Sequence, residues 1–511
     1  MTNFSLRRKP HPRHRRSVMA CLILALIVLP LTARVAADVS CPPIFTDNMV
    51  VQRDKPITIW GNANVGETVT VSFASQMVRT TADAAGHWSV SLDPLSTSFK
   101  SQALTVHGEN TLTFKDVLVG EVWLCTGQSN MVKPLGETPN QLPTDEYPQI
   151  LQKANITLLK LYTVPGYGKV TDEENQFQWK PSTAESVEQM KFSAACFYFG
   201  KELEAKLKVP IGLIHSSFGG TMIETWMPEE AFQKSPTLQK LRYREYFAWV
   251  EGVQANELYE NMISPLIPFT LAGVIWYQGE SNLIDGDNAS YTLKQKTLIE
   301  TWRDNWNDHK LPFYIAQLTP FTYSKLNRAK LLTVDALPIF WEAQINSVNG
   351  IENSGIISTL DLAPDVSDIH PVNKRDIGKR FALMALEKIY GQEVEGDAPR
   401  FSHVLSTSGN SITFEVANAP DGLSPQGELR ETTFQIAGED GHYYKATAKV
   451  SGHHVTLYSE KVHSPKTIRY AWNEVAQGDV FNKSGLPMLP FRTDQQPLET
   501  IRPQPASPSK K

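Results

Sequence analysis

The sequence lacks the short motifs by which most metal and nucleotide sites are recognised. It contains no H-E-x-x-H, no C-x-x-C and no other spacing typical of metal ligands. It also contains no P-loop and no G-x-G-x-x-G that follows an expected strand. We therefore expect a protein that needs neither a metal ion nor another cofactor.

A large excess of basic residues is also missing. The chain carries 49 Lys and Arg against 54 Asp and Glu, for a net charge of −5, and both signs are scattered along it. Nucleic-acid binders show a basic domain or stripe, so we expect no nucleic-acid partner. The 511 residues are enough for two or three domains. None of these properties predicts the oligomeric state.

Cysteine is scarce, with four residues in the whole chain. Cys21 falls in the N-terminal leader described below, which leaves Cys41, Cys125 and Cys196, an odd number with wide spacing. This pattern is neither a disulfide framework nor a zinc site. At most one pair can form, and the sequence does not say which. Because Cys125 and Cys196 lie in apolar stretches, we expect them to be buried thiols.

The first 37 residues have the three parts of an export signal. A basic head precedes an almost wholly apolar run at 18–31, and small residues follow at 35–37. The apolar run is short for a transmembrane helix. We predict that 1–37 is a signal peptide and that the mature chain starts near Asp38. It would then work in the periplasm or outside the cell without a membrane span. An uncleaved membrane anchor is the alternative.

Hydrophobic patterning divides the mature chain into three domains and a tail. Residues 38–116 carry short alternating strands separated by turn signals, which is typical of a small β-sandwich. Residues 117–395 change to an α/β pattern, and residues 396–497 return to short strands. The last segment, 498–511, is rich in Pro, Ser and Lys, and we predict a disordered tail.

The middle domain alternates two kinds of apolar pattern. Continuous apolar runs indicate buried strands, and apolar spacings of three and four indicate helices. Strands that alternate with helices form a mostly parallel sheet covered on both faces. Across the chain we predict strands at 68–73, 88–92, 117–126, 209–215, 272–276, 312–318, 411–416 and 454–458, and helices at 192–207, 291–306 and 374–390.

Ser129 follows the strand 117–126 in the string G-Q-S-N-M. Open α/β sheets bind their ligands at the carboxyl ends of strands, and Gly127 allows a tight turn that exposes the hydroxyl. Met131 stands where a G-x-S-x-G elbow has its second glycine, which argues against an α/β-hydrolase. Ser129 is therefore our candidate nucleophile. A turn serine that caps the next segment is the alternative.

A base and an acid for this serine are available in D-I-H-P at 368–371, in an expected loop. Serine hydrolysis needs a base that takes the hydroxyl proton and an acid group that orients that base. Residues i and i+2 of an extended stretch project to the same side, so Asp368 can reach the His370 imidazole. Asp365 and Glu280 are alternative acids, and a structural loop histidine is the alternative to a catalytic His370.

Two further strand ends carry polar turns. W-Y-Q-G-E-S-N at 276–282 includes Gln278, whose side-chain N–H is suited to an oxyanion. S-S-F-G-G-T at 216–221 includes glycines that let backbone N–H groups approach a ligand closely. Each string alone is an ordinary strand-to-helix turn. Together with Ser129 they place the groups that a serine esterase needs at one edge of the expected sheet.

At these residues the chain resembles the bacterial sialate O-acetylesterase family of the SGNH hydrolase superfamily. The resemblance spans nearly the whole mature chain. It is carried by M-V-V-Q-R at 49–53, I-W-G at 59–61, 117–131, 218–226, 276–282, W-R at 302–303, 368–374, R-Y-A-W at 469–472 and 485–494.

The resemblance implies a serine esterase that removes O-acetyl groups from sugars, above all from 9-O-acetylated sialic acids. It implies a three-layer α/β/α domain with a parallel sheet, flanked by N-terminal and C-terminal β-sandwich-like domains. Ser129 matches the nucleophile of the family and His370 its base, with Asp368 as the acid beside it. Gly220 and Gln278 match the oxyanion-hole blocks, which the Ser129 backbone N–H would complete. An acetylated sugar is the implied partner, and no cofactor is implied.

The chain departs from the family pattern at two places. Phe218 stands where the family usually has Trp, and the Asp and His of 368–370 are two residues apart where many SGNH enzymes have D-x-x-H. We expect Phe218 to line the sugar pocket and to contact the substrate together with Glu280 and Asn282. An acetylxylan esterase with the same chemistry is one alternative, and a non-catalytic carbohydrate-binding protein is another.

Overall fold

The structure is a computed structural model that describes residues 38–139, 141–165, 177–242, 252–326, 331–425, 427–429 and 432–497. The described residues all belong to one compact unit, which begins at Asp38. The expected signal peptide at 1–37 and the expected tail at 498–511 lie outside the described residues, so both stay predictions. Within the described part of the chain, no helix combines the length and the apolar character that a membrane crossing requires.

The N-terminal region is built of strands, and the last of them leads into the site. In β7 the first six residues alternate or are exposed, and the last eleven are all buried. The apolar run at 117–126 accounts for the buried part, because a strand inside a parallel sheet is covered on both faces. The predicted domain boundary at 116/117 therefore falls within a strand. The strands are β1 (Val50–Gln52), β2 (Ile57–Asn62), β3 (Thr68–Phe73), β4 (Gln76–Thr81), β5 (His87–Leu92), β6 (Ser98–His107) and β7 (Thr111–Gly127).

An 11-stranded mixed sheet forms the centre of the molecule. Its main path runs β13-β12-β11-β7-β10-β8-β9, and all of these neighbours are parallel except β8 and β9. The N-terminal half of β7 adds β1, β6, β3 and β4 to the same sheet. The strands are β8 (Ile156–Thr163), β9 (Lys180–Ser182), β10 (Ile211–Ser217), β11 (Gly273–Tyr277), β12 (Phe313–Ala316) and β13 (Ser354–Ile357).

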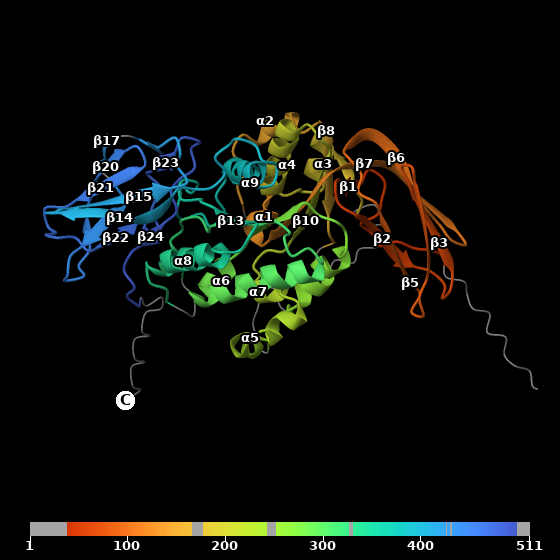
Figure 1. The fold of residues 1–511 in the computed structure, drawn as a ribbon, viewed down its shortest axis with the longest axis horizontal. Helices are drawn as coiled ribbons and strands as arrows, with labels where there is room; N and C mark the ends of the chain where they lie inside the picture. The colour runs from red at the N-terminus through yellow and green to blue at the C-terminus, as the bar shows by residue number, and fades with distance from the viewer. Residues whose placement is uncertain are drawn as a thin grey trace, which may run out of the picture. The chain divides into compact units, whose positions relative to one another are not determined.

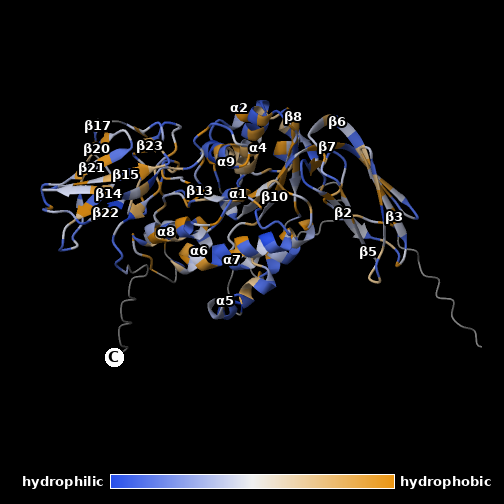
Figure 2. Cartoon of the chain, viewed as in Figure 1, coloured by the Kyte–Doolittle hydropathy of each residue, from blue (hydrophilic) through white to orange (hydrophobic). Residues whose placement is uncertain are grey.

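Two groups of helices pack on this sheet. Helices α4 and α9 contact each other, and they contact β8, β10, β12 and β13. Helices α7 and α8 form a second pair, and in Figure 1 they lie on the other side of the central strands. Both groups carry hydrophobic and hydrophilic residues (Figure 2), as helices with one buried face do. The helices are α1 (Ser129–Val132), α2 (Tyr147–Gln152), α3 (Ala184–Gln189), α4 (Ala194–Leu207), α5 (Pro236–Leu241), α6 (Glu280–Ile284), α7 (Ser290–Asn305), α8 (Ala336–Val348) and α9 (Arg375–Lys388), with short turns such as η1 (Ile223–Trp226) and η5 (Tyr323–Lys325).

A disulfide joins Cys125 of β7 to Cys196 of α4. Both residues are fully buried, so the expectation of burial is confirmed, and they form the one pair whose identity the sequence left open. Their Cα atoms lie 5.8 Å apart, within the usual range for a disulfide. The pairing could not be predicted because the two cysteines have a sequence separation of 71 and only the packing of α4 brings them together. Cys41 is free and partly buried.

The C-terminal region forms antiparallel sheets of its own. The larger sheet has the order β14-β15-β21-β20-β17, and a four-stranded sheet has the order β19-β18-β22-β24. Alternating burial in β15 follows the alternating sequence from which this strand was predicted. The strands are β14 (Arg400–Ser408), β15 (Ser411–Ala417), β16 (Leu423–Ser424), β17 (Gly427–Leu429), β18 (Phe434–Ala437), β19 (Tyr444–Lys445), β20 (Thr447–Ser451), β21 (His454–Tyr458), β22 (Thr467–Tyr470), β23 (Phe481–Asn482) and β24 (Phe491–Arg492).

The predicted strands and helices are present, with ends that differ by a few residues. Helix α8 and strands β8 and β13 are among the elements that were not predicted. Ten of the thirteen residues of α8 are buried, and the other three, Glu342, Ile345 and Asn346, lie on one side of the helix, so its polar stripe is too narrow to set a clear helical period in the sequence.

Candidate active site

Three neighbouring parallel strands end side by side at the expected site. Gly127 at the end of β7 pairs with Ser217 at the end of β10 and with Tyr277 at the end of β11. The Gln128 N–H donates to the Tyr277 carbonyl at 2.9 Å, and the Phe218 N–H donates to the Gly127 carbonyl at 3.0 Å. The structure thus brings together the three turns that follow these strands.

The turn before Ser129 requires glycine. Gly127 has a φ of +136°, and a Cβ there would lie 2.1 Å from the Tyr277 carbonyl oxygen. After this turn Ser129 begins α1. Ser129 is partly exposed, whereas its neighbours Gln128 and Asn130 are buried. The chain therefore presents one serine at the surface from a rigid, buried turn.

A second turn, Phe218–Thr221, lies against Ser129. A Cβ on Gly219 would be 3.4 Å from the Ser129 Cβ, so the backbone of this turn is close to the serine. Gly220 has a φ of +72°, in the left-handed region that favours glycine. The Thr221 hydroxyl donates to the Phe218 carbonyl at 2.8 Å and closes the turn. Backbone at this distance from a nucleophile is the arrangement that main-chain oxyanion donors need.

The loop of His370 reaches the same place from between β13 and α9. The Asn130 side-chain amide donates to the Ile369 carbonyl at 3.0 Å, so the residues next to Ser129 and next to His370 are in direct contact. His370 is partly exposed. The Asp368 carboxylate accepts the backbone N–H of His370 at 2.8 Å, and this hydrogen bond fixes the backbone of the loop.

The electrostatics of the site keep His370 neutral. Burial is the largest cause that lowers the pKa of its imidazole, to about 4, and the positive charges of Lys374 and Lys133 act in the same direction. Asp368 acts in the opposite direction. A neutral imidazole at pH 7 is the form that can accept a proton from a serine.

The three candidate carboxylates have different environments. Asp368 is partly buried beside His370, whereas Asp365 is exposed and accepts hydrogen bonds from the N–H and the hydroxyl of Ser367 at 2.8 and 2.6 Å. These bonds lower the pKa of Asp365. Glu280 is buried, which raises its pKa, and one oxygen accepts the Asn130 amide at 2.5 Å. Of the three, Asp368 alone has a hydrogen bond to His370 among the described residues.

Gln278 differs from its expected role as a direct oxyanion donor. Its side chain has no exposed area, and its amide nitrogen donates to Gln128 Oε1 at 3.1 Å, to the Thr221 carbonyl at 3.0 Å and to Asn282 Oδ1 at 2.8 Å. The Tyr291 hydroxyl donates to Gln278 Oε1 at 2.6 Å. An amide has two N–H groups, so these acceptors leave none for a substrate. Gln278 thus links the turn of Gln128, just before Ser129, to the turn that ends at Thr221.

Asn282 also lies behind the site rather than in it. It has no exposed area, accepts the Ile223 N–H at 2.9 Å and donates to Glu224 at 3.0 Å and to Asp287 at 2.8 Å. Lys294 bonds to both of these carboxylates, with 2.7 Å to Glu224. The structure does not support a substrate contact for Asn282, because its side chain satisfies this buried network.

The other two expected substrate contacts have opposite environments. Phe218 is partly exposed next to the Ser129 turn, so it can meet a ligand. Glu280 is only 3% exposed, and it faces Asn130. Of the three expected substrate contacts, Phe218 alone has appreciable exposed surface.

Three polar residues at this site were not predicted from the sequence. Asn130 and Lys374 are buried and bond to each other, with 2.6 Å between Lys374 Nζ and Asn130 Oδ1. Lys133 is also buried, and its Nζ donates to the Leu142 carbonyl at 2.8 Å. The available signal was their place in the sequence: Asn130 follows the serine, and Lys374 stands at the start of a predicted helix near His370.

Metal-ligand geometry occurs elsewhere in the described part of the chain. The side chains of Glu415, His453 and His454 have ligand atoms within 4.8 Å of one another, at β15 and at the start of β21. His453 and His454 lie at the β20–β21 hairpin. Among the described residues, no such group includes Ser129 or His370.

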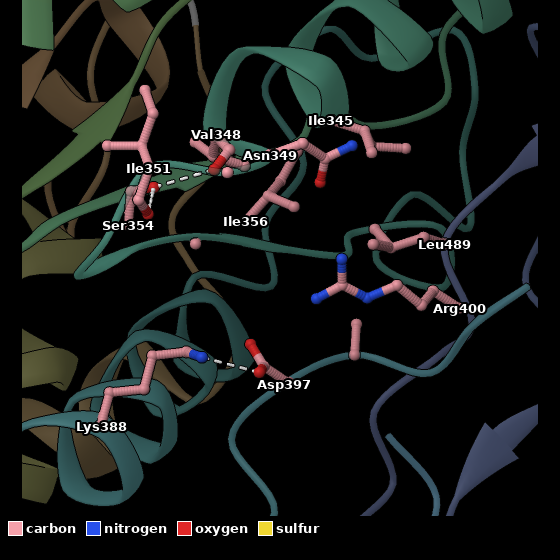
Figure 3. Close-up of a pocket in the computed structure, with 13 residues that line it drawn as sticks. Ile345, Val348, Asn349, Ile351, Ser354, Ile356, Lys388, Asp397, Arg400 and Leu489 are labelled. Atoms are coloured by element: carbon pink, nitrogen blue, oxygen red, sulfur yellow. Dashed lines mark hydrogen bonds and ion pairs between the residues drawn. The ribbon is translucent and has the colours of Figure 1, made fainter. Parts of the chain in front are cut away.

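One pocket lies away from the predicted residues. It has a volume of about 190 Å³ and is lined by the end of α8, by β13 and by Lys388, Asp397 and Arg400 (Figure 3). Lys388 and Asp397 form an ion pair of 2.7 Å along this wall. None of the predicted site residues lines this cavity, so it is separate from the candidate active site.

Comparisons with known proteins point to esterases. The model of the family described as "Carbohydrate esterase, sialic acid-specific acetylesterase" matches residues 119–387. The human sialate O-acetylesterase is 28% identical over 498 residues, covering 88% of this chain and 92% of that protein. The Pongo abelii sialate O-acetylesterase is 30% identical over 396 residues, covering 71% of this chain and 74% of that protein.

A solved structure extends the comparison to three dimensions. A carbohydrate acetylesterase from Xanthomonas citri has a TM-score of 0.76 and 32% sequence identity, and the match covers 90% of this chain and 100% of that one. With a serine at a sheet edge between two polar turns, these matches define the class: the protein is a carbohydrate esterase. More narrowly, the chain belongs to the sialic acid-specific acetylesterase family.

Proposed function

We propose that the chain hydrolyses O-acetyl esters of sugars through an acyl-enzyme on Ser129, with 9-O-acetylated sialic acids as its substrates. One arrangement carries this proposal: Ser129 has the glycine turn on one side and the His370 loop tied to its neighbour on the other. The family of the chain and the names of its relatives support the acetylated sugar as the substrate class.

In the first half of the reaction His370 takes the proton of the Ser129 hydroxyl, and Oγ forms a bond to the acetyl carbonyl carbon. The carbonyl oxygen becomes an oxyanion, which the backbone N–H groups of Ser129 and Gly220 stabilise. When the intermediate collapses, the bond to the sugar oxygen breaks. His370 returns its proton to that oxygen, and the deacetylated sugar leaves.

In the second half a water molecule gives a proton to His370 and attacks the acetyl group on Ser129. The second tetrahedral intermediate expels Ser129 Oγ, which recovers the proton from His370, and acetate is released. The partly exposed position of Ser129 supports this step, because water must reach the acyl carbon. All groups in both halves come from the chain, the substrate and water.

Asp368 and Gln278 support this chemistry in different ways. Asp368 orients His370 and favours its protonated form during the reaction, which agrees in direction with its effect on the His370 pKa. Gln278 acts as a positioning residue, because its amide joins Gln128 to the turn of Thr221. This assignment replaces the direct oxyanion contact expected from the sequence.

We further propose that the central sheet with α4 and α9 on one face and α7 and α8 on the other is the three-layer domain of an SGNH hydrolase. The N-terminal and C-terminal strands would form the flanking β domains. Export by the 1–37 signal into the periplasm or the medium is part of the proposal. The Cys125–Cys196 disulfide supports it, because such bonds persist in oxidising compartments.

The test compares acetylated substrates under initial-rate conditions. The purified mature chain is assayed on a chromogenic acetyl ester, on 9-O-acetylated sialic acid and on acetylated xylan, with acetate release as the readout. We expect the highest kcat/KM on the sialic acid. A higher kcat/KM on acetylated xylan would mean that the protein is an acetylxylan esterase. If no ester releases acetate, the enzyme assignment is overturned.

A further inference from the structure

Asn130 connects the nucleophile turn to two other elements through one buried side chain. Its amide nitrogen donates to Glu280 Oε1 at 2.5 Å and to the Ile369 carbonyl at 3.0 Å. Its oxygen accepts Lys374 Nζ at 2.6 Å. Both amide hydrogens and the amide oxygen therefore have partners on α6, on the His370 loop and just before α9. A shift of Asn130 would move the turn of Ser129 relative to the His370 loop.

Lys374 is unusual because it has no exposed area and forms no ion pair among the described residues. Its Nζ lies 5.3 Å from the centre of the Tyr277 ring, a favourable cation–π position. Its negative neighbours are Glu280 and Asp368, and its positive neighbour is Lys133. Burial is the main cause that lowers the pKa of Lys374 to about 7, and the charge of Lys133 lowers it too.

Glu280 completes the arrangement on the other side of Asn130. Its second carboxylate oxygen is buried and has no hydrogen-bond partner among the described residues. Two ionisable side chains are thus buried on opposite sides of one amide, directly behind the serine. Charges buried in this way do not stabilise a fold better than apolar side chains of similar size, so a contribution to the site is the simpler explanation.

We propose that Lys374 is a positioning residue of the esterase: through Asn130 it holds the His370 loop against the Ser129 turn, and its charge disfavours protonation of His370. Glu280 anchors the same amide from the opposite side. This inference rests on the proposed chemistry of Ser129 and His370. It gives a function to the Asn and Lys of the G-Q-S-N and 368–374 strings, which the reaction steps above do not use.

Charge and geometry can be separated by two substitutions of Lys374. Lys374→Met keeps a similar length but removes the charge and the hydrogen bond, whereas Lys374→Arg keeps the charge and changes the geometry of the donor. The groups that face His370 are Lys374, Lys133 and Asp368, and only the first of them is changed. The pH profile of kcat/KM on a small acetyl ester reports the pKa of the base in the free enzyme.

For Lys374→Met we expect the acidic limb of the profile to move to higher pH by on the order of one unit, because a positive charge near His370 is lost. We also expect kcat to fall about 10- to 100-fold, because the loop is less well positioned. Lys374→Arg should lower kcat while its acidic limb stays with the parent. The matched control is Lys160→Met on β8, a partly buried lysine that interacts with Asp116 and should keep both the limb and kcat.

The outcomes are decisive in each case. If Lys374→Met folds and has the same acidic limb and the same kcat as the parent enzyme, the inference is overturned. If Lys374→Met does not fold, Lys374→Arg decides: a lowered kcat with an unmoved limb supports the inference, and parent-like kinetics overturn it. Ser129→Ala is assayed beside them. If Ser129→Ala is active, the proposed function has failed, whereas an inactive Ser129→Ala beside parent-like Lys374 variants means that only this inference has failed.

Discussion

The side-chain amide of Asn130 donates a hydrogen bond to the main-chain carbonyl of Ile369 at 3.0 Å. These residues are 239 positions apart, yet each is the direct neighbour of a proposed catalytic residue, Ser129 in one case and His370 in the other. This hydrogen bond holds the Ser129 turn against the His370 loop, and it does so without involving the side chain of Ser129 or of His370. The activity should therefore depend on buried residues as strongly as on exposed ones, and the five predictions below address both kinds.

Ser129→Ala should lose activity by about 10⁴- to 10⁶-fold in kcat, because no other group can form the acyl-enzyme. Its melting temperature should stay close to that of the parent, since Ser129 is partly exposed. Acetate release and a thermal melt measure the two effects, and an organophosphate should label the parent at Ser129 alone. Ser367→Ala, an exposed serine three residues before His370, is the control and should keep its activity. Near-normal turnover by Ser129→Ala would falsify the mechanism.

Asp368→Asn should reduce kcat more than Asp365→Asn does. Asp368 contacts the His370 backbone and acts on its imidazole, whereas the Asp365 carboxylate is exposed and accepts its hydrogen bonds from Ser367. Glu280→Gln should be intermediate, because it weakens the support of Asn130 without touching His370. All three are compared on a small acetyl ester. If Asp365→Asn is the most damaged, or if Asp368→Asn equals the parent, the acid assignment is wrong.

Phe218→Trp should change the choice among sugars more than it changes the basic reaction. Phe218 is partly exposed beside the Ser129 turn, where a larger ring would narrow the space for a sugar but leave the acetyl group accessible. The measurement is kcat/KM on several acetylated sugars and on a small acetyl ester. Equal changes on all substrates would place Phe218 outside the sugar pocket.

Loss of the disulfide should lower stability while a thiol reagent leaves the parent active. The bond closes a loop with a sequence separation of 71, for which chain entropy gives about 4 kcal/mol of stabilisation. A Cys125→Ala and Cys196→Ala double variant should therefore melt at a clearly lower temperature. Cys41→Ala is the control, because Cys41 forms no disulfide.

Burial raises the pKa of Cys41 to about 12, so its thiol reacts poorly near neutral pH. Inactivation of the folded parent by a thiol reagent would contradict this account.

Acidification from pH 6.5 to pH 4 should destabilise the fold partly through His215 and His370. Burial lowers the pKa of each to about 4, from an ordinary value of 6.5. Between these values the unfolded chain binds protons that the folded chain excludes, so stability is full above pH 6.5 and falls as the pH approaches 4. Denaturant unfolding of His215→Gln should show a shallower loss over this range than the parent. His309→Gln, at an exposed histidine, is the control, and equal slopes in all three proteins would contradict the assignment.

The active-site elements with strong local signals could be predicted from sequence. The apolar run at 117–126 is buried in β7, and Gly127 takes the positive φ that the tight turn needs. The family resemblance identified the same strings that the structure brings to one edge of the sheet. The roles of two amide side chains were less well predicted. Gln278 was expected to contact the oxyanion and Asn282 the substrate, but both are buried and bonded to neighbouring residues.

The sequence by itself determined the alternation of strands and helices, the glycine turns and the family, because each is a property of neighbouring residues or of a motif. Only the tertiary structure decided which polar groups face Ser129, that Cys125 bonds to Cys196, and that Asn130 joins Lys374, Glu280 and Ile369. These are contacts between segments far apart in the chain. Their partners are selected by packing and by the need to satisfy every buried polar group, which no local pattern records.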